Sequence, residues 1–109
     1  MRAPAHPNDL DRKRIERALR QRKRYRYVEP RVHGAPDGYR VESPCCSRNI
    51  DPEGGVVDIA LLRFEAEAGN WHLFRKNHKT KSWEFDSTHP RLIEILELLN
   101  NDSERKFWQ

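Results

Sequence analysis

The chain has 109 residues and a formal net charge of +4, and 36% of its residues are hydrophobic against 35% charged. A chain of this length holds a single core, so we expect one domain over residues 9–109, preceded by a flexible tail over residues 1–8. No apolar run reaches the roughly 18 residues that cross a bilayer, and none follows the N-terminus, so we expect neither a membrane segment nor a secretory signal. The adjacent Cys45 and Cys46 cannot build a disulfide framework, which favours a reducing, cytoplasmic location.

The positive charge is concentrated toward the N-terminus. Residues 1–31 carry eleven Lys or Arg against four Asp or Glu, whereas residues 32–109 carry ten against thirteen. This imbalance makes the basic end a feature in its own right. Its densest part holds five cations in seven residues without a carboxylate: Arg20, Arg22, Lys23, Arg24 and Arg26.

The first predicted element is a helix at about residues 9–24. Asn8 or Asp9 supplies its cap, because side chains of this kind accept hydrogen bonds from the free N–H groups of a helix start. The apolar stripe of this helix is narrow and has three members: Ile15, Ala18 and Leu19. That stripe suffices to dock the helix on a sheet. Residues 29–38 contain two prolines and two glycines, so we expect a loop there.

Apolar stretches with alternating polar positions predict antiparallel strands at about residues 56–64, 71–76 and 82–86. The side chains expected to share a face within each strand are Ala60, Leu62, Phe64 and Ala66, then Trp71 and Leu73, then Trp83 and Phe85. A shorter strand at 39–42 precedes them. Pro44 places that strand at an edge, because proline cannot donate to a ladder.

The last main helix is predicted at about residues 90–100, with a wide apolar arc built on Leu92, Ile95, Leu96 and Leu99 at helical spacing. Phe107 and Trp108 are expected to pin the C-terminus to the core. The predicted fold is α+β: an antiparallel three- to four-stranded sheet on which the basic N-terminal helix and the leucine-rich C-terminal helix pack. The expected core comprises Val41, Ala60, Leu62, Phe64, Trp71, Leu73, Trp83, Phe85, Leu92, Ile95, Leu96 and Leu99.

Several blocks of this sequence resemble one known family. They are Tyr39–Glu42, Ser43–Pro52, Val57–Leu61, the spaced Trp71, Leu73, Phe74 and Trp83, the leucine-rich helix, and Phe107-Trp108. Together, over about residues 12–109, they are similar to the small bacterial proteins of domain-of-unknown-function family 3024. The resemblance implies a compact α+β domain from a bacterium and implies no activity. The basic run at residues 20–26 departs from the more apolar continuation expected in that family.

Two patterns are candidate sites of chemistry. Cys45 and Cys46 with a histidine would give zinc ligands, but adjacent strand residues point to opposite faces and there is no C-x-x-C. We therefore expect no metal and no other cofactor. The stretch from Gly54 to Ala60 is similar to the strand entry of PD-(D/E)xK nucleases, in which an Asp binds a divalent ion. The next strand lacks the second carboxylate that such a site needs, so we expect Asp58 to pair with Arg48 or Arg75.

These observations favour a non-enzymatic protein-interaction module that uses the apolar arc of the last helix, with a protein partner or a second copy of the chain. The alternative is weak, sequence-independent nucleic-acid binding through the basic N-terminal helix and the tip of the last hairpin. A further alternative is a degenerate relative of the PD-(D/E)xK nucleases. The residues predicted to bind nucleic acid are Arg20, Arg22, Lys23, Arg24, Arg26, Lys76, Lys79 and Lys81.

Overall fold

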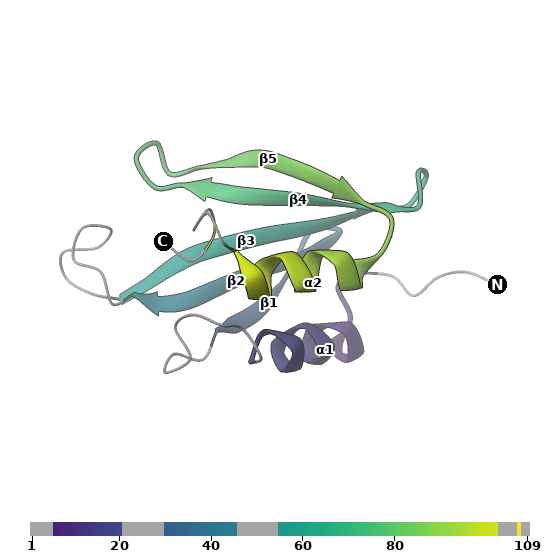
Figure 1. Cartoon of the computed structure of the whole chain (residues 1–109), viewed down its shortest axis with the longest axis horizontal. Coiled ribbons are helices and arrows are strands. Elements are labelled where there is room, and N and C mark those ends of the chain that lie inside the picture. Colours follow the sequence, from purple (N-terminus) through teal and green to yellow (C-terminus); the bar gives the residue numbers. More distant parts are fainter. Residues whose placement is uncertain (1–5, 21–29, 46–54, 103–106, 108–109) are drawn as a thin grey trace.

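The computed structural model of the chain describes residues 6–20, 30–45, 55–102 and 107. Within these residues the chain forms two helices and five strands (Figure 1). In chain order they are α1 (Asp9–Leu19), β1 (Arg31–Ala35), β2 (Gly38–Cys45), β3 (Gly55–Glu65), β4 (Asn70–Asn77), β5 (Ser82–His89) and α2 (Leu92–Asn101). In the part of the chain described here, no helix is long and apolar enough to cross a membrane.

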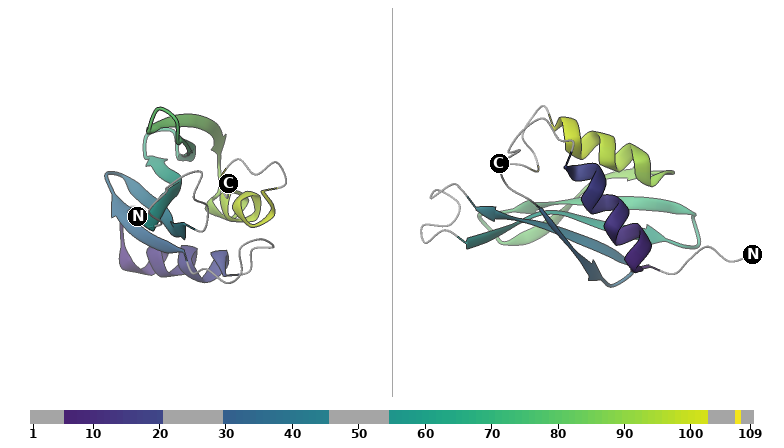
Figure 2. Two further views of the ribbon diagram at one scale, coloured as in Figure 1. Left: turned by 90° about the vertical axis from the view of Figure 1, so that its left-hand side faces the viewer. Right: turned by 90° about the horizontal axis from the view of Figure 1, so that it is seen from below.

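The five strands form one antiparallel sheet in the order β1-β2-β3-β4-β5. Buried residues of both helices belong to the same hydrophobic cluster as one face of this sheet. Figure 2 shows the sheet curled, with α2 lying across its open side and α1 beside it. We call the face covered by the helices the inner face and the opposite one the outer face. The α+β prediction is confirmed.

The prediction of three or four strands is wrong by one, because residues 29–38 contain β1 rather than only a loop. Val32 lies opposite Val41, and both are buried. Gly34 leaves room for the N-terminal segment, since a Cβ there would lie 2.9 Å from the ring of Pro7. Asp37, with φ of 61°, forms the turn into β2. The prolines and glycines therefore mark a tight hairpin rather than an irregular loop.

The place of β2 is also a correction, since it lies between β1 and β3 rather than at an edge. Pro44 pairs with Val56 of β3. On the other side of β2, the pairing with β1 extends only as far as Glu42, which lies opposite Arg31, the first residue of β1. Beyond that point β2 has no neighbour on its β1 side among the described residues. At Pro44 the strand β2 is therefore an edge of the sheet among the described residues, and the missing N–H of this proline is tolerated there.

Helix α1 starts as predicted and ends earlier than predicted. The Asn8 side chain caps it by accepting a hydrogen bond from the Asp11 N–H at 2.8 Å. Its buried residues are Ile15 and Leu19, two of the three predicted stripe positions. The helix ends at Leu19, and residues 21–24 of the predicted extension lie outside the described residues.

The tail predicted at residues 1–8 is described from His6 onward. His6 Nδ1 lies 2.8 Å from the Tyr39 hydroxyl, which also accepts a hydrogen bond from the Asn8 N–H at 3.0 Å. The His6 ring meets the rings of Phe64 and Trp71 edge-on, at centroid distances of 5.2 and 4.8 Å. The segment just before α1 is thus packed on the inner face.

Helix α2 buries the predicted stripe of Leu92, Ile95, Leu96 and Leu99. Strand β5 runs on to His89, so the helix begins at Leu92, slightly later than predicted. At its other end the carboxylate of Asp102 accepts a hydrogen bond from the N–H of Phe107, which is buried. Phe107 is an anchor, as predicted, whereas Trp108 lies outside the described residues.

Ten of the twelve predicted core residues are buried or packed against the core, Phe64 being partly buried. The two exceptions are in β5. Phe85 is 56% exposed, and Trp83 is half-buried outside the core cluster. Both lie on the outer face, because Trp83 is opposite Lys76 and Phe85 is opposite Phe74. Ala66, expected on the inner face, lies exposed in the β3–β4 turn.

Replacing a core leucine of α2 tests the docking of that helix on the sheet. Leu96→Ala should lower the free energy of unfolding by about 2–5 kcal/mol, because it removes buried methyl groups and leaves a cavity. Leu10→Ala, at a position of α1 that is 80% exposed, is the matched control and should change it little. Urea unfolding curves of the three proteins give the comparison. An unchanged midpoint for Leu96→Ala would contradict the packing described here.

Candidate functional site

The outer face is the part of the molecule where charged and aromatic side chains gather in solvent. Its positions follow from the strand register, since residues directly opposite each other in an antiparallel pair share a face. These positions include Arg31, His33, Arg40, Glu42, Asp58, Leu61, Arg63, Glu65, His72, Phe74, Lys76, Trp83 and Phe85. We treat this face as the candidate functional site.

A β-bulge in β3 places Asp58 on this face. Val41 lies opposite Ala60 and Glu42 lies opposite Asp58, so Ile59 is an extra residue in β3. A bulge of this kind turns two successive side chains toward one side. Ile59 and Ala60 are accordingly both buried. Asp58 is consequently turned outward, next to Glu42.

The charged side chains of the outer face form a continuous ladder across the strands. His33 Nε2 lies 2.6 Å from one oxygen of Glu42, and Arg40 NH1 lies 2.8 Å from the other. The same Arg40 nitrogen donates to Asp58 at 2.8 Å, and Lys76 Nζ lies 3.2 Å from the second Asp58 oxygen. We call these five residues the ladder. Of the two expected partners of Asp58, Arg75 pairs with Glu84 and Asp86 instead, and Arg48 lies outside the described residues.

The ladder keeps both of its carboxylates ionised. Burial alone would raise the pKa of Glu42, but hydrogen bonds from Arg40 and His33 outweigh it and bring that pKa below its ordinary value. Burial acts in the same way on Asp58, and the hydrogen bonds from Arg40 and Lys76 again lower the pKa. Each negative charge is therefore matched by cations within the ladder.

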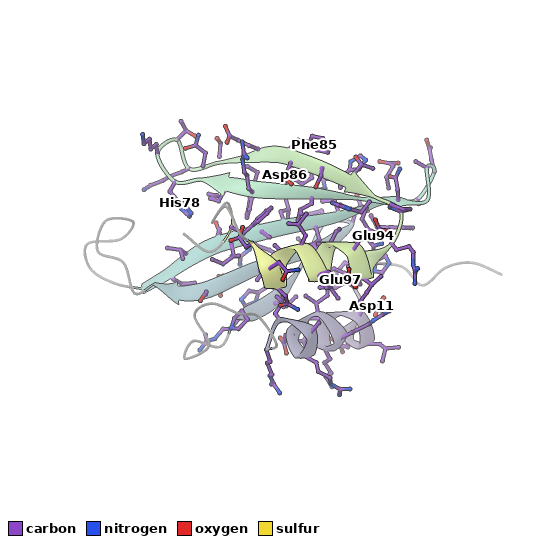
Figure 3. The ribbon with its side chains drawn as sticks, viewed as in Figure 1. Asp11, His78, Phe85, Asp86, Glu94 and Glu97 are labelled. Atoms are coloured by element: carbon purple, nitrogen blue, oxygen red, sulfur yellow. The ribbon has the colours of Figure 1, made fainter. Side chains whose placement is uncertain are left out.

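Aromatic rings lie beside the ladder on β4 and β5. A second bulge, at Asp86, separates the pair Leu73–Ser87 from the pair Phe74–Phe85, and it sets Phe85 on the outer face. Figure 3 shows Phe85 on the side of β5 away from α2, with Asp86 on the side toward it. Phe74 and His72 meet Phe85 edge-on, at centroid distances of 5.8 and 5.7 Å.

Trp83 connects these rings to the ladder. Lys76 Nζ lies 4.8 Å from the centre of the Trp83 ring, a distance at which a cation is attracted to the face of an indole. The same ammonium is bound to Asp58. Lys76 is thus held from two sides, and its side chain is only 16% exposed.

The turn between β4 and β5 carries two further cations. The Asn77 side chain accepts hydrogen bonds from the N–H groups of Lys79 and Thr80, at 3.0 and 3.2 Å. Lys79 and Lys81 are exposed. His78 (labelled in Figure 3) is half-buried, and both its burial and the charge of Lys76 lower its pKa. Histidine with a lowered pKa is neutral at pH 7.

The charge on the outer face differs between its two ends. The register places Arg31, Arg40 and Lys76 toward the β4–β5 turn, and Lys79 and Lys81 lie in that turn. We call these five cations the basic end. The only carboxylates that the register places among them, within the described residues, are Glu42 and Asp58. At the opposite end a shallow hollow of about 180 Å³ is lined by Asp37 and Glu65 together with Arg63 and His72, so it does not favour an anion.

The predicted nucleic-acid-binding residues fall into three groups. Lys76, Lys79 and Lys81 belong to the basic end, as described above. Arg20 is exposed at the end of α1. The four remaining predicted residues lie outside the described residues: Arg22, Lys23, Arg24 and Arg26. Sequence reasoning missed Arg31 and Arg40. Only the pairing register of β1 and β2 shows that both side chains lie on the outer face.

Neither the zinc site nor the nuclease site that the sequence raised gains support from the described residues, and Cys46 of the zinc site lies outside them. Nowhere in them do three His, Cys, Asp or Glu side chains converge as metal ligands do. Glu42 does supply, across the sheet, the second carboxylate beside Asp58 that a nuclease would need. However, Arg40 NH1 lies 2.8 Å from both carboxylates. A guanidinium therefore occupies the place between them where a divalent ion would bind.

The ladder makes the stability of the domain depend on acid pH. Because the folded pKa values of Glu42 and Asp58 are lowered, their stabilisation is present above their ordinary pKa values of 4.5 and 3.8 and is lost as the pH falls through the lowered values. Asp58→Asn should reduce stability at pH 7 and shrink the loss on acidification, as measured by urea unfolding at a series of pH values. Glu67→Gln, in the exposed β3–β4 turn, controls for net charge. An Asp58→Asn profile that parallels the wild type would contradict the ion pairs.

Comparison with known proteins gives a family and no more. No curated protein and no solved structure matches the chain. The family described as Domain of unknown function (DUF3024) matches residues 3–109, which include every strand and helix of the structure. The chain therefore belongs to the DUF3024 family.

Proposed function

We propose that this protein is a non-enzymatic binding domain of the bacterial cytoplasm, and that the basic end of its outer face holds nucleic acid without sequence preference. The observation that carries this proposal is that the described residues of the basic end combine five cations with two carboxylates, both already paired. Lys and Arg side chains neutralise the phosphate groups of nucleic acids and release their counterions.

The carboxylates of Glu42 and Asp58 are paired with cations and so do not repel a phosphate. A free aspartate on the same face would repel a phosphate, whereas Arg40 and Lys76 neutralise Asp58 at 2.8 and 3.2 Å. Lys79 and Lys81 are left exposed at the turn. Cations presented in solvent on a rigid hairpin steer a polyanion toward the surface. The ladder thus keeps the face positive, and the turn lysines make the first contacts.

A protein-interaction domain is the second candidate function, and the exposed Phe85 favours it. The apolar stripe of α2, which was predicted to contact a partner, is buried in the core and is therefore not available for binding. Phe85 instead lies on β5, which is an edge strand of the sheet. Association with a partner or a second copy through this ring would tolerate salt, whereas phosphate binding weakens steeply as salt rises. Light scattering of the free protein in low and high salt separates the two.

The turn lysines provide the first test of nucleic-acid binding. Lys79→Gln/Lys81→Gln should weaken binding to a single-stranded oligonucleotide and flatten the plot of log affinity against log salt by roughly 0.7 for each phosphate that the protein no longer neutralises. Lys13→Gln/Arg14→Gln, at two exposed positions of α1, removes the same charge elsewhere and should keep the wild-type slope. Fluorescence anisotropy at several salt concentrations measures both. Equal slopes for the two double variants would exclude the basic end as the phosphate site.

The basic run between α1 and β1 provides an independent test. Arg22→Gln/Lys23→Gln/Arg24→Gln should leave folding intact, because mutual repulsion among these cations disfavours packing them together. For each phosphate that this run neutralises, the salt slope should fall by roughly 0.7 with a single strand, or about 0.9 with a duplex. A slope identical to that of the wild type would mean that this run never touches phosphates and that binding is confined to the outer face.

A further inference from the structure

Phe85 is a large apolar side chain that the fold leaves in solvent. It is 56% exposed, while every other aromatic ring of the outer face within the described residues is half-buried. Phe74 and His72 contact it edge-on, so its position on β5 is supported from the neighbouring strand β4. A ring that is already held in place loses little conformational freedom when it binds a ligand.

Trp83 lies next to Phe85 on the same face of the same strand. Successive residues on one face of a strand are about 6.6 Å apart, which is comparable to the distance between neighbouring bases of an extended single strand. The Trp83 ring is held by the ammonium of Lys76 at 4.8 Å, and Lys76 is in turn held by Asp58. Two positioned rings therefore follow one another along β5.

Three cations of the basic end lie near this pair of rings: Lys76, Lys79 and Lys81. Lys81 precedes Trp83 by two residues in the chain, and Lys79 lies in the same turn. Arg40, held between two carboxylates, lies on the same face, three strands away. Aromatic rings flanked by phosphate-binding cations are the arrangement by which proteins bind single strands without reading sequence.

We propose that β5 is a stacking platform for single-stranded nucleic acid, with unpaired bases stacking on Phe85 and Trp83 while Lys79 and Lys81 bind the adjoining phosphates. The inference rests on the proposed function and names its ligand as single-stranded. The bases of a duplex are already stacked on one another inside the helix and do not reach these rings. Charge complementarity selects this occupant over an apolar protein surface, which would gain nothing from the surrounding lysines.

The test compares two ligands with the same number of phosphates. One is an oligothymidylate of about 12 nucleotides and the other is an abasic strand of equal length, since the first offers bases to stack and the second does not. The wild-type protein should bind the oligothymidylate more tightly, by about 5- to 150-fold for each stacked base. Phe85→Ala should reduce the affinity for the oligothymidylate by one such factor and leave binding of the abasic strand unchanged.

Two further variants separate the ring from the fold. Phe85→Tyr keeps an aromatic ring and should bind the oligothymidylate as the wild type does. Leu10→Ala removes another exposed apolar side chain, on α1, and should also bind as the wild type does. Because Phe85 is largely in solvent, the melting temperature of Phe85→Ala should stay near that of the wild type.

The outcomes distinguish this inference from the proposed function. Equal, salt-dependent binding of the two strands would overturn the stacking platform and leave phosphate binding standing. Absence of binding to either strand at low salt would overturn both. A dimer that is stable in high salt and is abolished by Phe85→Ala would overturn the stacking platform, because Phe85 would then belong to a protein interface.

Discussion

The extra residue in β3 is the constraint on which both faces of this domain depend. Strict alternation would give Asp58 and Ala60 the same direction, so a carboxylate would point into the core beneath the helices. Burying an ionised carboxylate without a partner is so unfavourable that such groups change their protonation state instead. The bulge resolves this conflict because Ile59 and Ala60 both face inward. Asp58 is thereby placed where Arg40 and Lys76 reach it.

Arg40 has a particular part in this arrangement, because one of its nitrogens serves two carboxylates from two different strands. Ion pairs of partly exposed groups contribute only modest stability, since solvent screens them. Their larger effect here concerns the charge that the face presents. With Glu42 and Asp58 neutralised inside the ladder, the cations beyond it determine the potential that an approaching ligand meets.

Much of the fold could be predicted from the sequence because its signals are local. The spacing of Leu92, Ile95, Leu96 and Leu99 gives α2, and Asn8 gives the start of α1. The first strand could not be predicted, because its short apolar content is interrupted by Gly34 and ends at Pro36-Asp37. Only the pairing of Val32 with Val41 across the hairpin reveals it as a strand.

The site was less predictable than the fold, since it depends on register. Lys79 and Lys81 could be placed at a hairpin tip because the strands on either side are clear. The direction of Trp83 and Phe85 could not, because alternation within β5 says which residues share a face but not which face that is. The partners of Asp58 are equally non-local: Arg40 is eighteen residues away in the chain, and the bulge that brings them together has no sequence signature beyond the unbroken apolar run after Asp58.

The two helices cover only one face of the sheet, and this division decides what the other face is free to do. Tyr39, Trp71 and Leu73 already fill the inner face against α1, α2 and Phe107. The side chains of the outer face are therefore under no demand to build a core, and a sheet face with its own charged ladder stays in solvent without inviting a second sheet. An exposed phenylalanine on an edge strand works against that protection. Phe85 nevertheless lies on the same face as Trp83 and Lys76, which is the combination of rings and positive charge that the proposed stacking platform requires.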